Sequence, residues 1–236
     1  MTGPRFTQTA LYLCICLLLC SCAYPTLETT PAADTAPLAT LEPRAGEKLL
    51  RVDAQKSLIQ IYTYRGGRLA KFGHNHVIAA RRIQGSATLT AQVRGSRFNL
   101  RVPLAALTVD EPALRLAAGS DFASEPTADD IAATRANMLG PDGLAAAEFP
   151  AASITGEITA VNGARASLTI TLQLRGQSVT LKSGDNHFER TSSGTRLSGQ
   201  LRVRQSDLGM TAFSALGGAL VVLDEVVIHY DVVAHH

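Results

Sequence analysis

The sequence predicts an all-β domain of antiparallel strands, and three observations support this fold class. Apolar and polar residues alternate along much of the chain, which is typical of strands with one buried and one solvated face. Turn-forming residues such as Asn162-Gly163 separate the alternating runs and favour tight hairpins. Only one stretch has the features of a helix. This combination predicts a sandwich or a closed barrel with one inserted helix.

The alternating runs indicate about eight to ten strands. In the clearest run, Leu168, Ile170 and Leu172 share one face, whereas Thr169 and Thr171 share the other. A closed barrel would leave no exposed sheet edges, and a barrel of about eight strands has room for a small ligand. The predicted strands cover residues 49–53, 57–64, 77–93, 97–103, 152–161, 165–174, 177–182, 196–204 and 221–234.

The inserted helix is predicted to begin after Thr127 and to run through Met138. Thr127 is a suitable N-terminal cap, and Asp129 and Asp130 follow in the first turn. Acidic residues there interact favourably with the positive end of the helix dipole. The helix is expected to end before Gly140-Pro141, because proline cannot continue a helix.

The first residues of the chain have the pattern of an export signal. Arg5 precedes a short apolar run over residues 11–19, which ends in Leu19-Cys20-Ser21-Cys22. That ending resembles the lipobox of bacterial lipoproteins, and the resemblance implies cleavage before Cys22 and acylation of its thiol, for example with palmitate. The run is shorter than the ~20 residues that a membrane-spanning helix needs.

These features divide the chain into three parts. We expect a lipoprotein signal peptide at residues 1–21, an acylated cysteine and flexible tether at 22–45, and the β-barrel domain at 46–236. The tether is predicted from its content of Pro, Thr and Ala. The protein is therefore expected in the bacterial cell envelope, lipid-anchored on the periplasmic side of a membrane. Ala23 is compatible with the outer membrane.

Composition and motifs argue against several classes of function. The formal net charge is +2, and the arginines are scattered, which argues against a nucleic-acid partner. The four cysteines all lie in the leader, so the mature domain has no thiol nucleophile, disulfide or cysteine zinc site. No nucleophile elbow, phosphate loop or dinucleotide fingerprint occurs. The adjacent acidic pair Asp110-Glu111 is predicted to be helix-start charge or solvated loop, and we expect no enzyme activity.

A pair of histidines is the sharpest candidate for chemistry. On an extended segment His74 and His76 would point to the same face, and imidazole is the commonest metal ligand in proteins. With a third ligand such as His187 or His229 they would form a site for zinc, copper or haem iron, but no third ligand lies at a telling spacing. The alternatives are a polar rim that contacts a ligand headgroup and a loop whose imidazoles bond to backbone. The segment Asp185-Asn186-His187 is predicted to be a loop.

Several short motifs, taken in order, resemble the YceI-like family of bacterial secreted proteins over about residues 47–234. The resemblance implies an extended, lipocalin-like antiparallel barrel of eight strands, whose pore holds a long isoprenoid chain in some members. The Gly-His-Asn-His element of this chain belongs to a variant branch and not to the prenyl-binding members. The motifs are Phe72-Gly73-His74-Asn75-His76-Val77, Arg135 to Gly140, Leu174-Arg175-Gly176, Gln205 to Gly209 and Asp224-Glu225-Val226.

The predicted function is non-catalytic binding of a small apolar or amphipathic molecule, such as a lipid or an isoprenoid, inside the barrel. Two alternatives remain: a metal- or haem-binding envelope protein that uses His74 and His76, and a ligand-free structural or stress-related domain with a filled core. A homodimer is compatible with each of these roles. No cofactor other than such a lipid is expected. The candidate ligand-binding residues are Phe72, His74, His76, Phe98, Leu100, Met138, Leu172, Met210 and Phe213.

Overall fold

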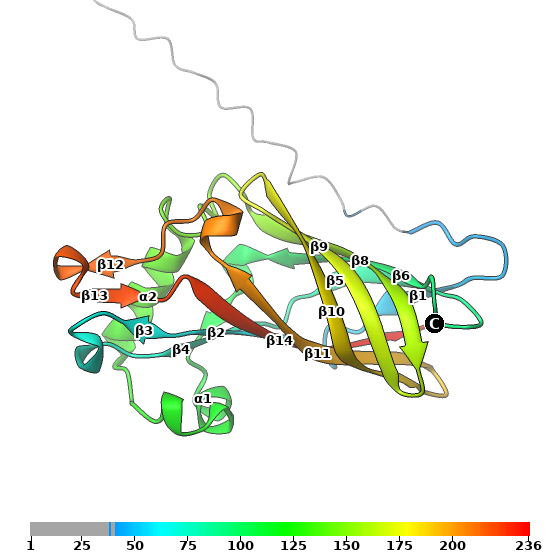
Figure 1. The fold of residues 1–236 in the computed structure, drawn as a ribbon, viewed down its shortest axis with the longest axis horizontal. Coiled ribbons are helices and arrows are strands. Elements are labelled where there is room, and N and C mark those ends of the chain that lie inside the picture. Colours follow the sequence, from blue (N-terminus) through cyan, green and yellow to red (C-terminus); the bar gives the residue numbers. More distant parts are fainter. Residues whose placement is uncertain (1–37, 39–40) are drawn as a thin grey trace, which may run out of the picture. The chain divides into compact units, whose positions relative to one another are not determined.

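Eight antiparallel strands close into a barrel (Figure 1). The computed structural model describes residue 38 and residues 41–236; the predicted signal peptide, Cys22 and most of the predicted tether lie outside these residues. Closure is made by the pairing of the first and last strands, in which Val52 lies opposite Ala234. The barrel strands, in spatial order, are β1 (Lys48–Val52), β5 (Gln84–Leu89), β6 (Arg97–Pro103), β8 (Ala151–Asn162), β9 (Arg165–Leu174), β10 (Gln177–Arg190), β11 (Gly194–Arg204) and β14 (Glu225–His235). The expected fold class is confirmed.

Further strands extend the barrel at one end. β2 (Leu58–Thr63) pairs with β14, β4 (His76–Ala80) pairs with β2, and β7 (Thr108–Val109) pairs with β4. A separate small sheet contains β12 (Ser214–Ala215), β13 (Leu220–Val222) and β3 (Arg65–Gly66). In Figure 1 this small sheet and α2 lie at one end of the barrel, and the C-terminus lies at the other.

The prediction of one strand over residues 77–93 is wrong. The structure has two strands there, β4 and β5, which pair with different neighbours. The exposed pair Arg81-Arg82 lies between them and Ile83 is buried. These two adjacent exposed arginines break the alternation. The chain passes there from the pairing of β4 with β2 to the pairing of β5 with β1 and β6.

The described residues contain two α-helices, α1 (Pro112–Ala118) and α2 (Ala128–Leu139), so the prediction of a single helix is wrong. The predicted helix itself is confirmed as α2. The hydroxyl of Thr127 accepts a hydrogen bond from the backbone N–H of Asp130 at 3.2 Å, and the carboxylate of Asp130 accepts one from the N–H of Thr127 at 2.9 Å. α1 is only seven residues long, which is too short for a helical period to stand out. The 3-10 helices are Ala70–Phe72, Leu104–Ala106, Ser120–Phe122, Ser206–Leu208 and Leu216–Gly218.

The predicted hairpin at Asn162-Gly163 is present between β8 and β9. Asn162 pairs with Arg165, so the two loop residues are Gly163 and Ala164. Gly163 has φ 58°, a conformation that glycine adopts without strain. The dipeptide thus predicted the hairpin correctly, with the loop displaced by one residue.

The prediction of a loop at Asp185-Asn186-His187 is wrong, because β10 continues through these residues to Arg190. The register between β10 and β9 shifts between Ser183 and Asn186, and Asn186 is buried. Its amide donates to the carbonyl of Ala166 at 2.9 Å, and its side-chain oxygen accepts from the hydroxyls of Ser183 and Tyr230. A β-bulge re-aims a side chain in this way, and the hydrogen bonds stabilise the buried amide.

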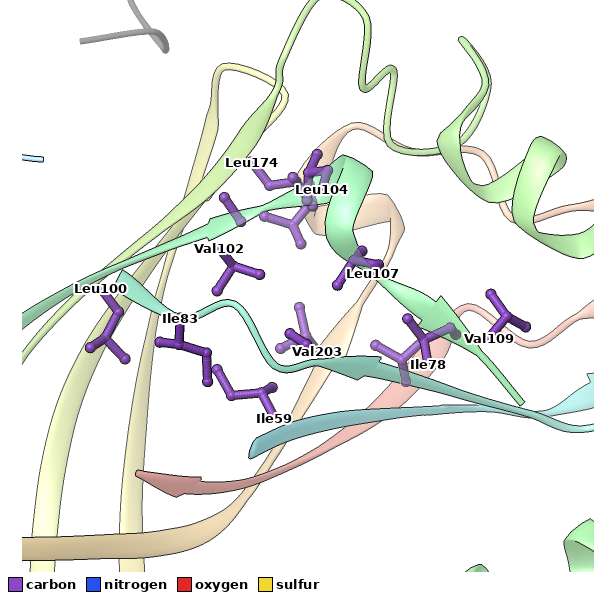
Figure 2. Close-up of a cluster of buried hydrophobic side chains, with 14 residues drawn as sticks. Ile59, Ile78, Ile83, Leu100, Val102, Leu104, Leu107, Val109, Leu174 and Val203 are labelled. Atoms are coloured by element: carbon purple, nitrogen blue, oxygen red, sulfur yellow. The ribbon is translucent and has the colours of Figure 1, made fainter. Parts of the chain in front are cut away.

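Buried apolar side chains from β2, β4, β6, β7 and β11 form a large cluster. Figure 2 shows Ile59 and Ile78 facing Val102, Leu107 and Val203 across this cluster. A second cluster contains Val93, Ile158, Ala166, Leu168, Ile170 and Phe188. Among the described residues, no helix is long and apolar enough to cross a membrane.

Candidate ligand-binding cavity

A cavity of about 400 Å³ lies inside the barrel. Its walls are mostly apolar, because the inward faces of the barrel strands and one face of α2 supply the lining. Concave, mostly apolar cavities of this size are typical of small-molecule sites. Members of both core clusters line it, including Leu100, Val203, Ile158 and Ile170.

Most of the candidate ligand-binding residues line this cavity, and two do not. Phe72 is 67% exposed, and the Nζ atom of Lys71 lies 4.9 Å from the centre of its ring. His74 also lies outside the lining; its Nδ1 is 3.1 Å from the hydroxyl of Ser124. The residues that line the cavity are His76, Phe98, Leu100, Met138, Leu172, Met210 and Phe213.

His76 is held in place by a buried carboxylate. It begins β4, and its Nδ1 lies 2.6 Å from Oδ2 of Asp110, whose side chain is fully buried. The other oxygen of Asp110 accepts hydrogen bonds from the backbone N–H of Val77 at 2.9 Å and from Arg115 at 2.5 Å. Asp110 has φ 55°, in the left-handed region that aspartate tolerates better than most residues.

Arg115 is buried and holds Asp110 in place, so that His76, Asp110 and Arg115 form one buried cluster. Arg115 projects from α1, and besides Asp110 it donates to the carbonyls of Asn75 at 2.7 Å and Phe122 at 2.8 Å. The short helix α1 thus brings a guanidinium into the protein to neutralise Asp110. The expectation that Asp110 supplies charge at a helix start or lies in a solvated loop is wrong, because Asp110 is buried. Glu111 does lie at the start of α1, and its carboxylate pairs with Arg81 at 2.7 Å.

Asp110 remains ionised near neutral pH. Burial raises its pKa, but hydrogen bonds from His76, the N–H of Val77 and Arg115 outweigh burial and lower the pKa below the usual value of 3.8. An ionised carboxylate only accepts hydrogen bonds, so Nδ1 of His76 carries the proton of the bond between them. The remaining ring nitrogen, Nε2, lies 3.5 Å from the hydroxyl of Thr134 on α2, and both residues line the cavity.

The structure brings His74 close to His76, with 6.2 Å between the ring centres, but it does not bring His187 to them. His187 lies on β10, and β11, β14 and β2 separate that strand from β4. Within the described part of the chain, no group of three or more His, Cys, Asp or Glu residues has a geometry that could hold a metal ion.

Other polar groups line the cavity. Arg97, at the start of β6, pairs with Glu47 at 2.9 Å. Tyr230 donates its hydroxyl to Asn186, and burial raises the pKa of Tyr230 to about 12. Sequence reasoning missed Asp110, Arg115 and Thr134 as parts of a site, because no local motif links them to His76.

The buried cluster generates a stability prediction. Replacing Asp110 by alanine leaves Arg115 buried without its counter-ion, and we expect the free energy of unfolding to fall by about 3–5 kcal/mol. Chemical denaturation of the purified protein measures this loss. Glu111→Ala is the matched control, because it removes a partly exposed pair and should cost only about 0–1 kcal/mol. Equal losses in the two variants would contradict the role assigned to Asp110.

Several solved structures resemble this chain in fold. The crystal structure of Burkholderia cenocepacia BcnA aligns with a TM-score of 0.56 and 14% identity, over 77% of this chain and 98% of BcnA. A mutant CJ YceI protein aligns with a TM-score of 0.50 and 12% identity, over 67% of this chain and 84% of that chain. At these identities the likeness concerns the fold alone.

The comparison with curated proteins gives no match, whereas a comparison with family models does. The model of the YceI-like domain matches residues 50–234, which is most of the chain and nearly all of the barrel. The range agrees with the span over which the sequence motifs resemble that family. The chain therefore belongs to the YceI-like domain family.

Proposed function

We propose that this barrel binds one elongated apolar or amphipathic molecule, of the lipid or isoprenoid type, without transforming it. The observation that carries the proposal is the apolar cavity of about 400 Å³, lined mainly by inward-facing residues of the barrel strands. The hydrophobic effect favours the transfer of an apolar chain into such a space. Family membership supports the proposal, since YceI-like domains bind isoprenoid-like ligands and are generally not catalytic.

The size of the cavity favours an occupied barrel over a ligand-free structural or stress-related domain. Protein interiors are close-packed and contain few voids larger than a water molecule. Water in a space lined mostly by apolar side chains finds few hydrogen-bond partners, so leaving this lining in contact with water costs free energy. An apolar ligand removes that cost by supplying the missing contacts.

The alternative of a metal- or haem-binding protein has less support. Nδ1 of His76 is engaged by Asp110, and Nδ1 of His74 faces the hydroxyl of Ser124. A metal would need further ligands beside this pair, and the described residues supply no suitable group. His76, which lines the cavity, fits a polar end of a ligand site better than a metal centre, whereas His74 lies outside the lining.

We also propose that the domain is an envelope lipoprotein, anchored through acylated Cys22 on the periplasmic side of a membrane. The support is the leader sequence, in which Leu19-Cys20-Ser21-Cys22 follows a short apolar run. Residues 22–45 would link the lipid anchor to the barrel. A small apolar ligand and the membrane are then the expected partners.

A substitution in the cavity wall tests ligand binding. Leu172 lines the cavity, and Leu172→Gln places an unpaired amide against the ligand. Burying such a group costs about 1–3 kcal/mol, so we expect the affinity for an apolar fluorescent probe, N-phenylnaphthylamine, to fall by at least about fivefold. Fluorescence titration measures the affinity.

The neighbouring residue on β9 provides the control. Thr171 faces outward, where its hydroxyl lies 3.1 Å from that of Thr180. Thr171→Gln should leave the affinity for the probe unchanged. Equal effects of the two substitutions, or no saturable binding to the unmodified protein, would contradict a ligand site inside the barrel.

A second prediction concerns the anchor. In cells grown with radiolabelled palmitate, Cys22→Ser should abolish labelling and release the protein from the membrane fraction, because serine lacks the thiol that is acylated. Cys20→Ser should leave both properties unchanged. Continued labelling of the Cys22→Ser variant would show that this cysteine is not the acylated residue.

A further inference from the structure

We propose that the His76 end of the cavity binds a hydroxyl group on an otherwise apolar ligand, and that this hydroxyl donates a hydrogen bond to Nε2 of His76. The inference rests on the proposed function, because it concerns the polar end of the molecule that the cavity holds. It identifies the ligand class as a long-chain alcohol or a similar amphiphile with a hydrogen-bond-donating end.

Asp110 determines which ring nitrogen of a neutral His76 carries the proton. The carboxylate of Asp110 accepts the Nδ1 proton at 2.6 Å, and it keeps its negative charge through the bonds from Val77 and Arg115. In a neutral imidazole only one ring nitrogen carries a proton. Nε2 is then a hydrogen-bond acceptor in the wall of the cavity.

The contact between Nε2 of His76 and the Thr134 hydroxyl is long enough to admit a ligand group. The nearest polar neighbour of Nε2, the Thr134 hydroxyl, lies 3.5 Å away, which is long for a hydrogen bond. Thr63, which pairs with His76 between β2 and β4, and Asn137, one turn after Thr134 on α2, also line the cavity. A ligand hydroxyl that donates to Nε2 would be able to accept a bond from Thr134, and both polar groups would be satisfied.

The side chains of His76, Asp110 and Arg115 together offer no net positive charge to a ligand. Arg115 neutralises Asp110 at 2.5 Å, so with a neutral His76 the three side chains carry no net charge. A carboxylate headgroup has no proton to donate to Nε2 and would lose its own hydration on entering the cavity, whereas a hydroxyl can donate to Nε2.

Matched ligands test the inference in the purified protein. We expect dodecanol to bind about tenfold more tightly than its methyl ether, because the ether leaves Nε2 without a donor. Dodecanoate should bind more weakly than dodecanol. Isothermal titration measures the three affinities. In His76→Phe the alcohol and the ether should bind equally, whereas the control His74→Phe should keep the preference.

A second variant, Asp110→Asn, changes Nε2 of His76 from a hydrogen-bond acceptor to a donor. In Asp110→Asn, the amide oxygen can keep the bonds from Val77 and Arg115, while the amide N–H₂ faces Nδ1 of His76. The proton of His76 then moves to Nε2, which becomes a donor. The preference for dodecanol over the ether should disappear in this variant, provided that circular dichroism shows a native fold.

The outcomes separate the inference from the proposed function. If the unmodified protein binds the alcohol and the ether equally, or binds dodecanoate most tightly, the inference is overturned while ligand binding stands. If His76→Phe keeps the preference for the alcohol, the inference is also overturned. If none of the three molecules binds, the proposed function itself fails.

Discussion

The pairing of β1 with β14 is the constraint on which the rest of the structure depends. It joins the two ends of the domain through Arg51 opposite His235 and Val52 opposite Ala234, and it turns a sheet into a barrel. Closure of eight strands fixes an interior wide enough for side chains and one small ligand. The alternation of residues then decides the lining: Leu172 faces the cavity, and Thr171 faces Thr180 on the outside. The apolar cavity is thus a consequence of closure and alternation together.

The buried cluster of His76, Asp110 and Arg115 contributes both to the stability of the protein and to the proposed binding site. A buried ion pair such as Asp110 with Arg115 costs free energy of desolvation, and here backbone groups compensate, since Arg115 also bonds to the carbonyls of Asn75 and Phe122. The result is an imidazole with a fixed orientation at the wall of an apolar space. Fixed polar groups of this kind determine which end of an amphipathic ligand enters a site.

The sequence was sufficient to predict features that depend on local pattern. Alternation located β9 at residues 165–174, and Thr127 with Asp130 located the start of α2. Features that depend on long-range pairing were missed. Asp110 lies 34 residues from His76, and only the pairing of β4 with β7 brings them together. The family resemblance, and not the alternation, gave the choice of a closed barrel over a sandwich.

Native mass spectrometry of the protein, extracted from its producing cells in mild detergent, tests the central claim most directly. A barrel that holds a lipid-type ligand predicts an added mass of a few hundred daltons that is extracted into organic solvent. A protein that carries no added mass would contradict the claim and would favour a domain without a ligand. An added mass the size of a metal ion, removed by a chelator, would contradict the claim as well and would favour a metal site at His74 and His76.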